Sequence, residues 1–394
     1  MIIMSYIPIG PIHPGIKEPL RIKLKTEGER VVAAEVDLGY FYRGAEQIAK
    51  GKPWQKVVYL SERVCGICSH FHPVTFIEGL EKIADCEPPL RAQYLRVIIG
   101  ELNRIQSHLI ANALYFLAIE HETLAIYLLN IREKIMDLTE MITGNRVHYA
   151  WNIVGGVRMD IKESQKKKIL ENLDIVEPAV YRYRKMFKTG AFLGLRSKDI
   201  GKMSKKDAID VRAVGPIARG SGVKFDWRQK HPTFTDYFDF KPVWRKEGDN
   251  YARIMVRFDE ILESIKIIRR AIDELPEGPI RKECEIPEGS IDNRYEAPRG
   301  EVTYIFETAK NGIIKDITIR TPTIMNLEAC VKHMFNDSPT IADAVAIYQS
   351  IDPCIACTER VTIIDEHGNK KDFRGMNNLL KEHSRRKEGM RGKL

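Results

Sequence analysis

The sequence predicts an α+β protein that is predominantly helical, with a central helical bundle and small peripheral sheets. Apolar residues recur at helical spacing from Pro89 to Gly144 with no proline inside, which is enough chain for at least two long helices. Glu163–Lys188 and Tyr251–Leu275 carry the same spacing and predict two more amphipathic helices. Short alternating, β-branched runs near both ends of the chain predict the sheets.

The first fifty residues predict a small sheet followed by a short helix. Ile2–Pro19 is extended and rich in proline and glycine. Leu20–Leu24 and Val31–Leu38 alternate in polarity across a glycine-containing turn, as expected for a hairpin-like pair of strands. Ala45–Lys50 has the composition of a short helix. This region therefore supplies one of the peripheral sheets.

The second half of the chain predicts a loop, two more strands and a last helix. Ala213–Val243 is rich in glycine, proline and aromatic residues and is expected to be loop. Val302–Phe306 and Ile313–Ile319 are expected to be short strands, and Leu327–Ile351 is expected to be helical. No strong linker, internal repeat or low-complexity segment divides the chain, so we expect one folded unit.

Composition predicts a large core and a mixed surface. The 394 residues are 44% hydrophobic, which is enough to bury a sizeable core. The formal charge of +8 arises from 62 basic and 54 acidic residues, and much of the excess lies in the tail Lys370–Lys393. We therefore expect no nucleic-acid partner. Polar residues interrupt the longest apolar stretch, roughly Leu109–Ile131, which excludes a transmembrane helix of the usual kind.

The seven cysteines fall into two close pairs and three isolated residues. The sequence has no secretory signal pattern, so the expected compartment is a reducing cytosol. In that compartment the close pairs indicate a metal or redox site. We expect the isolated Cys86, Cys284 and Cys330 to be ordinary small apolar residues.

The two Cys-x-x-Cys pairs, Cys65 with Cys68 and Cys354 with Cys357, bracket most of the chain. Thiolates are soft ligands, so four of them predict a soft-metal site built from both ends of the folded protein. Arg63 beside the first pair would lower the pKa of its thiols and favour metal binding.

The local sequence predicts a helix start at each pair. Asp352 is a good N-cap and Pro353 is favoured at the first helical position, which would place Cys354 and Cys357 one turn apart. The positive end of that helix would favour thiolates. The first pair is expected near a helix start as well.

Two other interpretations of the cysteine pairs stay open on spacing alone. Zinc ribbons usually keep their pairs within about 15–20 residues, whereas here the chain from 69 to 353 lies between them. A thioredoxin-like redox pair would need a βαβ context, which the predicted elements lack.

Other residues have both a chemical and an ordinary structural interpretation. His70 and His72 follow the first pair and are either ligands or hydrogen-bond donors to the thiolates. His13 lies in a proline-framed turn, where a histidine packed against backbone is the simpler interpretation. Four more residues have a possible chemical role and an ordinary alternative. The alternatives are an exposed surface carboxylate for Glu18, a helix-start carboxylate for Glu46, a surface salt bridge for Arg299 and a turn position for Thr323.

These motifs resemble the large, catalytic subunit of nickel–iron hydrogenases over essentially the full chain. They are most similar to the membrane-bound, energy-converting branch (group 4), which is related to the quinone-site subunit of respiratory complex I. That relative keeps the fold but lacks the four cysteines, which are all present here. Besides the cysteine pairs, the matching motifs are Arg43-Gly44-x-Glu46, Cys68-x-x-x-His72, Ala297-Pro298-Arg299-Gly300, Thr321-Pro322-Thr323, Gly10-Pro11-Ile12-His13-Pro14, Gly144-Asn145-Arg146, Gly155-Gly156-Val157-Arg158 and Gly215-Pro216-x-Ala218-Arg219-Gly220-Ser221-Gly222.

The resemblance implies the nickel–iron hydrogenase large-subunit fold and a nickel–iron centre. Cys65 and Cys354 would be terminal nickel ligands. Cys68 and Cys357 would bridge nickel to an iron that carries carbon monoxide and cyanide. Sulfur ligands suit a redox-active nickel.

The resemblance also implies roles around the centre. His72 would hydrogen-bond a bridging sulfur. Arg299 would hang over the open site, held by Asp352, and Pro298 and Thr323 would surround the diatomic ligands.

For proton transfer, the resemblance implies that Cys354 or Arg299 takes the proton and that Glu18 begins the path outward. Glu46 would lie at the far end of the active-site region, near a third metal such as magnesium or in a structural network.

One departure concerns the end of the catalytic domain. Many soluble members have a metal-binding histidine three residues after the last cysteine, and here that position is Arg360. The magnesium site is therefore in doubt. We expect one large-subunit domain over 1–360 and a C-terminal extension, 361–394, that a maturation endopeptidase removes after Arg360. The alternative is a permanent basic arm.

The implied reaction is reversible reduction of protons to H2. The remaining cysteines are too scattered for an iron–sulfur cluster in this chain. The resemblance therefore implies a small iron–sulfur subunit, a ferredoxin-type electron donor and membrane ion-translocating subunits. The chain would lie on the cytoplasmic side of the cell membrane as a peripheral part of that complex. The alternatives are a complex I-like quinone-linked or non-catalytic coupling subunit and a zinc-stabilised scaffold.

Overall fold

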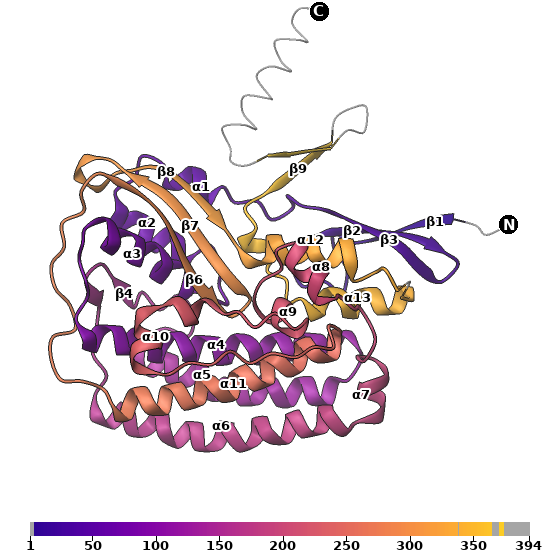
Figure 1. The fold of residues 1–394 in the computed structure, drawn as a ribbon, viewed down its shortest axis with the longest axis horizontal. Coiled ribbons are helices and arrows are strands. Elements are labelled where there is room, and N and C mark those ends of the chain that lie inside the picture. The colour runs from indigo at the N-terminus through magenta and orange to yellow at the C-terminus, as the bar shows by residue number, and fades with distance from the viewer. Residues whose placement is uncertain (1–3, 338, 365–369, 374–394) are drawn as a thin grey trace, which may run out of the picture.

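Four long helices form the centre of the computed structural model, which describes residues 4–337, 339–364 and 370–373. They are α4 (Leu90–Ala118), α5 (Glu122–Thr143), α6 (Glu163–Thr189) and α11 (Asn250–Asp273). Helix α4 packs against α5 and α11, and α6 covers the other side of both (Figure 1). All four helices expected from apolar periodicity are confirmed.

The buried side chains of each helix follow the distribution of apolar residues in its sequence. Helix α6 lies on the outside and buries one stripe at three- and four-residue spacing, which includes Ile169, Leu173, Val176 and Val180. Helix α4 is buried almost all round, and its interior side chains include several polar and charged residues. A helix of that kind needs partners for its buried polar groups, and three of these groups, on Asn103, Gln106 and Ser107, contact the site described below.

Two three-stranded antiparallel sheets flank the bundle. One has the order β1-β2-β3 and projects away from it, and the other has the order β6-β7-β8 and lies beside α2 and α3 (Figure 1). The strands are β1 (Met4–Ile9), β2 (Arg21–Glu27), β3 (Arg30–Asp37), β6 (Gly289–Ala297), β7 (Gly300–Thr308) and β8 (Ile314–Arg320). The predicted N-terminal hairpin and the two later strands are confirmed, whereas β1 and β6 are additional strands.

Helix α3 (Phe71–Ile83) packs directly on β6 and β7. A Cβ at Gly79 of this helix would lie 2.7 Å from the Phe306 ring, so glycine permits the close approach. The other elements are α1 (Ala45–Ala49), α2 (Trp54–Glu62), β4 (Asn152–Ile153), β5 (Gly156–Val157), α7 (Ala191–Leu195), α8 (Lys205–Asp210), α9 (Gly215–Gly220), η1 (Trp227–Lys230), α10 (Pro232–Tyr237), η2 (Lys310–Gly312), α12 (Pro322–His333), α13 (Ile341–Ser350), η3 (Ile355–Cys357), β9 (Val361–Ile364) and β10 (Lys370–Phe373).

Two expectations for the second half of the chain are wrong. Ala213–Val243 contains the short helices α9, η1 and α10, so it is not simply loop. Leu327–Ile351 is split between α12 and α13, because Pro339 and a capping box between Thr340 and Asp343 begin a new helix.

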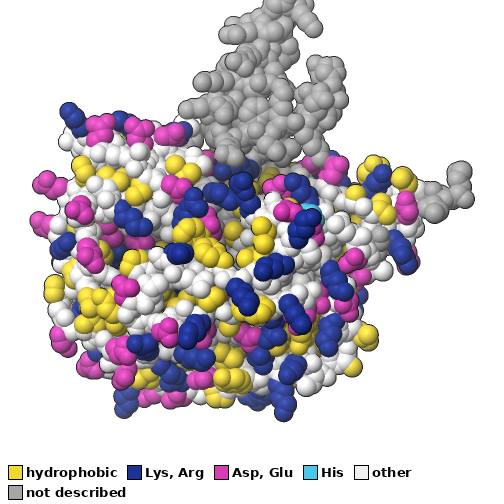
Figure 2. All heavy atoms as spheres, viewed as in Figure 1, with side chains coloured by type: hydrophobic (Ala, Val, Ile, Leu, Met, Phe, Trp, Pro, Cys, Tyr) yellow, Lys and Arg dark blue, Asp and Glu magenta, His cyan; other side chains and the backbone are white. Residues whose placement is uncertain are grey.

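The described part of the chain buries two apolar clusters. The larger joins the bundle to β6–β8, and the smaller lies between the N-terminal sheet and α12–α13. Acidic and basic side chains are interspersed on the face shown in Figure 2. Among the described helices, none combines the length and the apolar character needed to cross a bilayer.

Candidate metal centre

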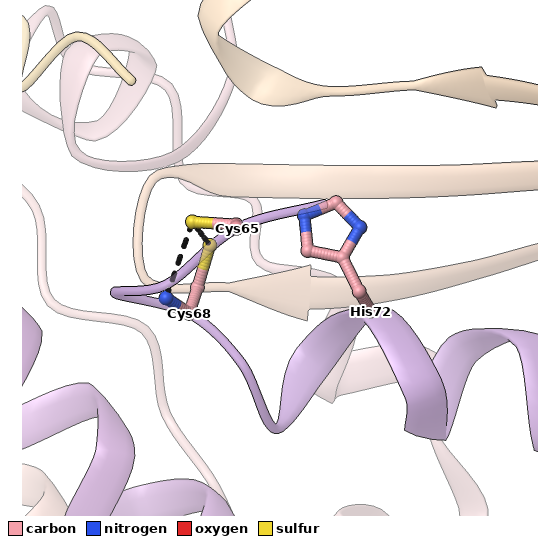
Figure 3. A group of neighbouring side chains, drawn as sticks. All are labelled: Cys65, Cys68 and His72. Atoms are coloured by element: carbon pink, nitrogen blue, oxygen red, sulfur yellow. Dashed lines mark hydrogen bonds between the residues drawn. The ribbon is translucent and has the colours of Figure 1, made fainter. Parts of the chain in front are cut away.

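The first cysteine pair lies in the connection between α2 and α3, close to the start of α3 as expected (Figure 3). The Cys65 sulfur accepts a hydrogen bond from the Cys68 backbone at 3.3 Å, and the two sulfurs are 2.8 Å apart. Helix α4 fixes the loop, because Asn103 and Gln106 both donate to the Ile67 carbonyl, at 2.9 and 2.7 Å.

The second pair does not begin an α-helix, which corrects the prediction. Asp352 has a left-handed backbone, with φ of 54°, and Cys354 is extended. Only the short 3₁₀ turn η3 follows, and the backbone N–H of Cys354 is bound by the Thr323 hydroxyl oxygen at 3.1 Å. The thiols are therefore arranged by a turn that α12 supports rather than by a helix end.

The fold brings all four thiols together. The sulfurs of Cys65 and Cys354 are 3.5 Å apart, although the residues are separated by 289 positions. Hydrogen bonds from Cys354, Cys357 and Cys68, in that order, hold the pKa of Cys65 well below its usual range despite burial. All four cysteines are less than 5% exposed. A closely spaced, water-excluded set of four sulfur donors fits a nickel–iron centre in its ligand chemistry.

The two histidines after the first pair have different surroundings. His72 lies against Cys65 and Cys68, with side-chain ligand atoms within 4.8 Å of theirs (Figure 3). The Nδ1 of His72 is 2.8 Å from the Tyr304 hydroxyl. Its hydrogen bond to Cys65 contributes to lowering the pKa of that thiol. His70 instead contacts Asn152, at 3.2 Å, and burial lowers its pKa to about 3.

Arg299 lies in a two-residue turn between β6 and β7, because Ala297 pairs with Gly300 across it. Its Nε donates to the Asp352 carbonyl at 2.7 Å and its Nη2 to the Asp352 carboxylate at 2.8 Å. A third nitrogen is 3.5 Å from the Ser107 hydroxyl. Arg299 is 3% exposed, so the surface salt-bridge interpretation is wrong.

The electrostatic surroundings keep this guanidinium charged. Burial lowers the pKa of Arg299, but the Asp352 carboxylate and the thiols of Cys354, Cys68 and Cys65 raise it by more. Burial raises the pKa of Asp352, and Arg299 and Arg257 oppose that rise. A fixed positive charge thus faces the cysteine cluster.

Glu18 is tied to the second cysteine loop. One of its oxygens accepts hydrogen bonds from the backbone N–H groups of Ile355 and Ala356, the latter at 3.1 Å. Burial raises the pKa of Glu18, and the backbone bond from Ala356 opposes this. Glu18 is therefore not a free surface carboxylate. His13, in the preceding turn, accepts a bond from the Gly15 backbone at 3.1 Å, as expected of a turn histidine.

Pro298 and Thr323 have different relations to the cluster. Pro298 is buried in the turn that carries Arg299. The Thr323 hydroxyl lies 4.0 Å from the Cys357 sulfur, at the start of α12. Thr323 is thus more than a turn residue, since it contacts the cysteine loop. Ser107 and Tyr304 were not expected at the site from the sequence, because neither lies in a motif that identifies it.

The surroundings of Glu46 do not fit a third metal. Its carboxylate oxygen accepts a hydrogen bond from the Ile319 backbone at 2.8 Å and binds Arg360 Nη1 at 3.1 Å. Arg360 Nη2 also donates to the Ile319 carbonyl, at 3.3 Å. The guanidinium therefore supplies the positive charge that a divalent cation would bring to this carboxylate.

The segment expected to be a C-terminal extension follows Arg360. Its described residues form two antiparallel strands, β9 and β10. A Cβ at Gly39 would lie 2.6 Å from a Val361 methyl group, so the first residue of β9 packs tightly on that glycine. Residues 365–369 and 374–394 of the expected extension lie outside the described residues.

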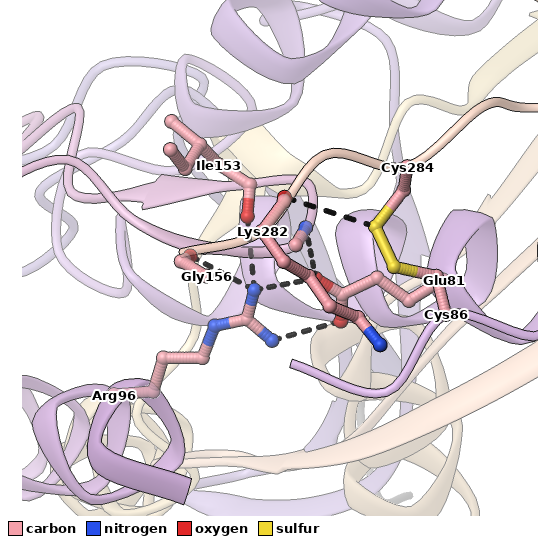
Figure 4. The surroundings of a disulfide bond; sticks show 8 residues. Glu81, Cys86, Arg96, Ile153, Gly156, Lys282 and Cys284 are labelled. Carbon is pink, nitrogen blue, oxygen red and sulfur yellow. Dashed lines mark hydrogen bonds and ion pairs between the residues drawn. A yellow bond between two sulfur atoms is a disulfide. The ribbon is translucent and has the colours of Figure 1, made fainter. Parts of the chain in front are cut away.

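Two of the isolated cysteines are not ordinary apolar residues, which corrects the prediction. Cys86 and Cys284 form a disulfide whose Cα atoms are 6.0 Å apart (Figure 4). It attaches the segment 276–288 to the end of α3, and Lys282 of that segment also donates from its backbone to the Gly155 carbonyl at 3.0 Å. Cys330 is free and buried, as expected, and burial raises its pKa to about 12.

Two protein families match complementary parts of the chain. Residues 119–284 and 280–360 match the family described as respiratory-chain NADH dehydrogenase, 49 Kd subunit. Residues 43–118 match nickel-dependent hydrogenase. The first cysteine pair therefore falls within the match to nickel-dependent hydrogenase, and the second pair falls within the match to the 49 Kd subunit family.

Individual relatives cover most of the chain. A membrane-bound hydrogenase subunit alpha from Pyrococcus furiosus is 37% identical, over 91% of this chain and 88% of the relative. A carbon monoxide-induced hydrogenase from Rhodospirillum rubrum is 35% identical, over 90% and 99%. A subunit of NADH-quinone oxidoreductase from Rhizobium etli is 38% identical, over 69% and 68%.

The fold is also similar to a solved structure, that of a membrane-bound sulfane sulfur reductase, described as an archaeal respiratory membrane complex. The TM-score is 0.85 at 26% identity, over 90% of this chain and 98% of that one. The chain belongs to the large subunits of membrane-bound nickel–iron hydrogenases, a family related to the 49-kDa subunit of respiratory complex I.

Proposed function

We propose that this chain is the catalytic subunit of an energy-converting complex that reversibly reduces protons to H2. The observation that carries the proposal is the buried cluster of four thiols, two from each end of the chain, with sulfurs 2.8 and 3.5 Å apart and a guanidinium fixed beside them. In this proposal Cys65 and Cys354 would hold nickel, and Cys68 and Cys357 would hold both nickel and an iron with carbon monoxide and cyanide ligands. When bound, that centre supplies the electrons that combine with protons.

The residues of the chain would handle the proton. Because its surroundings raise the pKa of Arg299, this residue stays charged and serves as a hydrogen-bond donor and source of positive potential. In this proposal the base is a terminal thiolate such as Cys354 Sγ. Glu18, bound at the adjacent Ile355 and Ala356 backbone with a raised pKa, is suited to receive the proton and pass it outward.

Electrons must come through a partner. The three remaining cysteines are a disulfide pair and one isolated buried thiol, which cannot hold an iron–sulfur cluster. We therefore propose a small iron–sulfur subunit fed by a ferredoxin-type donor, and membrane subunits that translocate ions, with this chain peripheral on the cytoplasmic side. The extension after Arg360 is proposed to be removed by a maturation endopeptidase.

A substitution in the purified complex tests this function. Serine at Cys357 replaces a soft ligand with a harder one and should prevent assembly of the centre. We expect the Cys357→Ser complex to lose nickel, the carbon monoxide and cyanide infrared bands, and hydrogen evolution. Cys330→Ser, at a buried thiol away from the cluster, is the matched control. Full nickel occupancy with normal hydrogen evolution in Cys357→Ser would refute the assignment.

A second function is favoured by the similarity to the NADH-quinone oxidoreductase relative and to the sulfane sulfur reductase complex. In this alternative the chain is a quinone-linked or non-catalytic coupling subunit. It predicts an active wild-type complex without nickel, so metal analysis of the same preparation separates the two functions.

A further inference from the structure

Arg43 contacts both cysteine loops at once. Its Nη1 donates to the Arg63 carbonyl at 2.8 Å, and its Nη2 donates to the Val64 carbonyl at 2.6 Å. The same Nη2 donates to the Ala356 carbonyl at 2.5 Å. Val64 immediately precedes Cys65, and Ala356 lies between the two cysteines of the second pair. One guanidinium therefore joins the backbones that carry the two pairs.

These three contacts depend on the planar shape of the guanidinium, which a lysine side chain lacks. A guanidinium holds five N–H donors in one rigid plane, so three carbonyls bound to it have their relative positions fixed. A lysine ammonium is a flexible point charge and fixes no such geometry. The side chain of Arg43 is 38% exposed, so hydrophobic burial contributes little to holding it.

Glu359 completes this arrangement from the other side. Its carboxylate is 3.9 Å from the Arg43 guanidinium, and its second oxygen accepts a hydrogen bond from the Ala45 backbone at 2.9 Å. Glu359 is 2% exposed and follows the last cysteine by two residues. The segment that contains Arg43 therefore donates to the second cysteine loop, and Glu359, just after that loop, accepts from the segment of Arg43 in return.

We propose that Arg43 is a positioning residue of the metal centre, which sets the separation of the two cysteine pairs by binding the backbone of both loops. The proposal rests on the proposed function. Arg43 touches no sulfur, so it acts through the loops. Residues that orient ligands in this way typically change metal affinity or activity roughly 10- to 100-fold when they are altered.

The test is Arg43→Lys in the purified, nickel-loaded complex, with Arg30→Lys, an exposed arginine on β3, as the matched control. We expect turnover per nickel to fall roughly 10- to 100-fold and the carbon monoxide and cyanide infrared bands to shift or broaden. A purely structural role would lower the yield of complex but leave turnover per nickel and the bands unchanged. That result, or wild-type behaviour throughout, would overturn the proposal.

A second measurement does not depend on nickel. In metal-free protein, a mild two-electron oxidant should join Cys65 either to Cys68, whose sulfur is 2.8 Å away, or to Cys354, whose sulfur is 3.5 Å away. Peptide mass spectrometry would quantify the Cys65–Cys354 cross-link separately. We expect Arg43→Ala to reduce its yield several-fold, and an unchanged yield would overturn the positioning role. If wild-type complex contains no nickel but Arg43→Ala still lowers the cross-link, the proposed function fails while the positioning role stands.

Discussion

Replacement of Arg299 by lysine isolates the contribution of a guanidinium to the reaction. The change keeps the positive charge beside the thiols but removes the paired donation to Asp352, through Nε at 2.7 Å and Nη2 at 2.8 Å. A lysine cannot reach both acceptors with a fixed orientation. The remaining charge is therefore free to move away from the position that the cluster requires.

The size of the effect follows from these contacts. A hydrogen bond that involves a charged group contributes about 1.5–3 kcal/mol. If one such bond is lost only as the transition state forms, turnover falls roughly 10- to 150-fold, because about 1.4 kcal/mol corresponds to a tenfold change in rate. A loss of about 10²-fold is also typical of removing one preorganised donor from an active site.

The assay is hydrogen evolution from a reduced dye, normalised to nickel content. We expect Arg299→Lys to keep its nickel and iron while turnover per nickel falls. Arg294→Lys is the matched control, since Arg294 lies on β6, the strand that leads into the turn of Arg299, and pairs with the exposed Asp292 at 2.8 Å. Activity within a few-fold of wild type would remove Arg299 from the mechanism, and loss of nickel would reassign it to assembly.

Three further measurements test other parts of the molecule. Glu18→Gln should cut both turnover and hydrogen-isotope exchange with water while metal content and infrared bands stay intact; normal exchange would place the proton path elsewhere. Burial, and next the Asp226 carboxylate, raise the pKa of Glu296 from 4.5 to about 7, so the stabilisation from its protonated form is complete below pH 4.5 and lost as pH rises towards 7. Relative to wild type, the free energy of unfolding of Glu296→Gln should therefore increase between pH 4.5 and pH 7, by up to about 3 kcal/mol. If denaturation curves give the same difference between the two proteins at both pH values, this prediction is wrong. Intact-mass measurement should find the mature chain lighter by residues 361–394 only when nickel is supplied, whereas a full-length chain in an active complex would make the extension permanent.

The long helices could be predicted because their signal is local. In α6 the apolar stripe repeats every three or four residues over the whole helix, and no distant contact changes it. Strand β6 was not predicted because its pattern is hidden by buried polar residues. Asn293 donates to the Thr75 carbonyl at 2.7 Å, and Glu296 binds Arg219 at 2.8 Å. Polar side chains buried by such specific contacts resemble a surface segment in the sequence.

At the metal centre, spacing and family motif predicted which residues converge, but not the backbone that presents them. The Asp-Pro dipeptide before the second pair is typical of a helix start. In the structure Asp352 is left-handed instead, and Arg299 binds both its carbonyl and its carboxylate. The tertiary contact has overridden the local preference.

The pairing of Cys86 with Cys284 lies beyond sequence reasoning for a different reason. The two residues are 198 positions apart, and neither belongs to a motif. Only the packing of the end of α3 beside the segment 276–288 brings them together. The ion pair between Arg360 and Glu46 also lies beyond sequence reasoning, because it forms only where α1 and β8 meet in the fold.

The disulfide has a consequence for how the chain would respond to proteases. Arg281 and Lys282 have exposed side chains on the segment that it fastens, so trypsin has a cleavage site there once the short backbone pairing of this segment with Gly155 and Gly156 opens. A cut at either residue leaves Cys86 in the amino-terminal fragment and Cys284 in the carboxy-terminal one. The two fragments would migrate as one species on a denaturing gel without reductant and separate only when a thiol is added. A single nick would leave the two cysteine pairs on separate polypeptides, still covalently connected through a bond at the opposite end of α3.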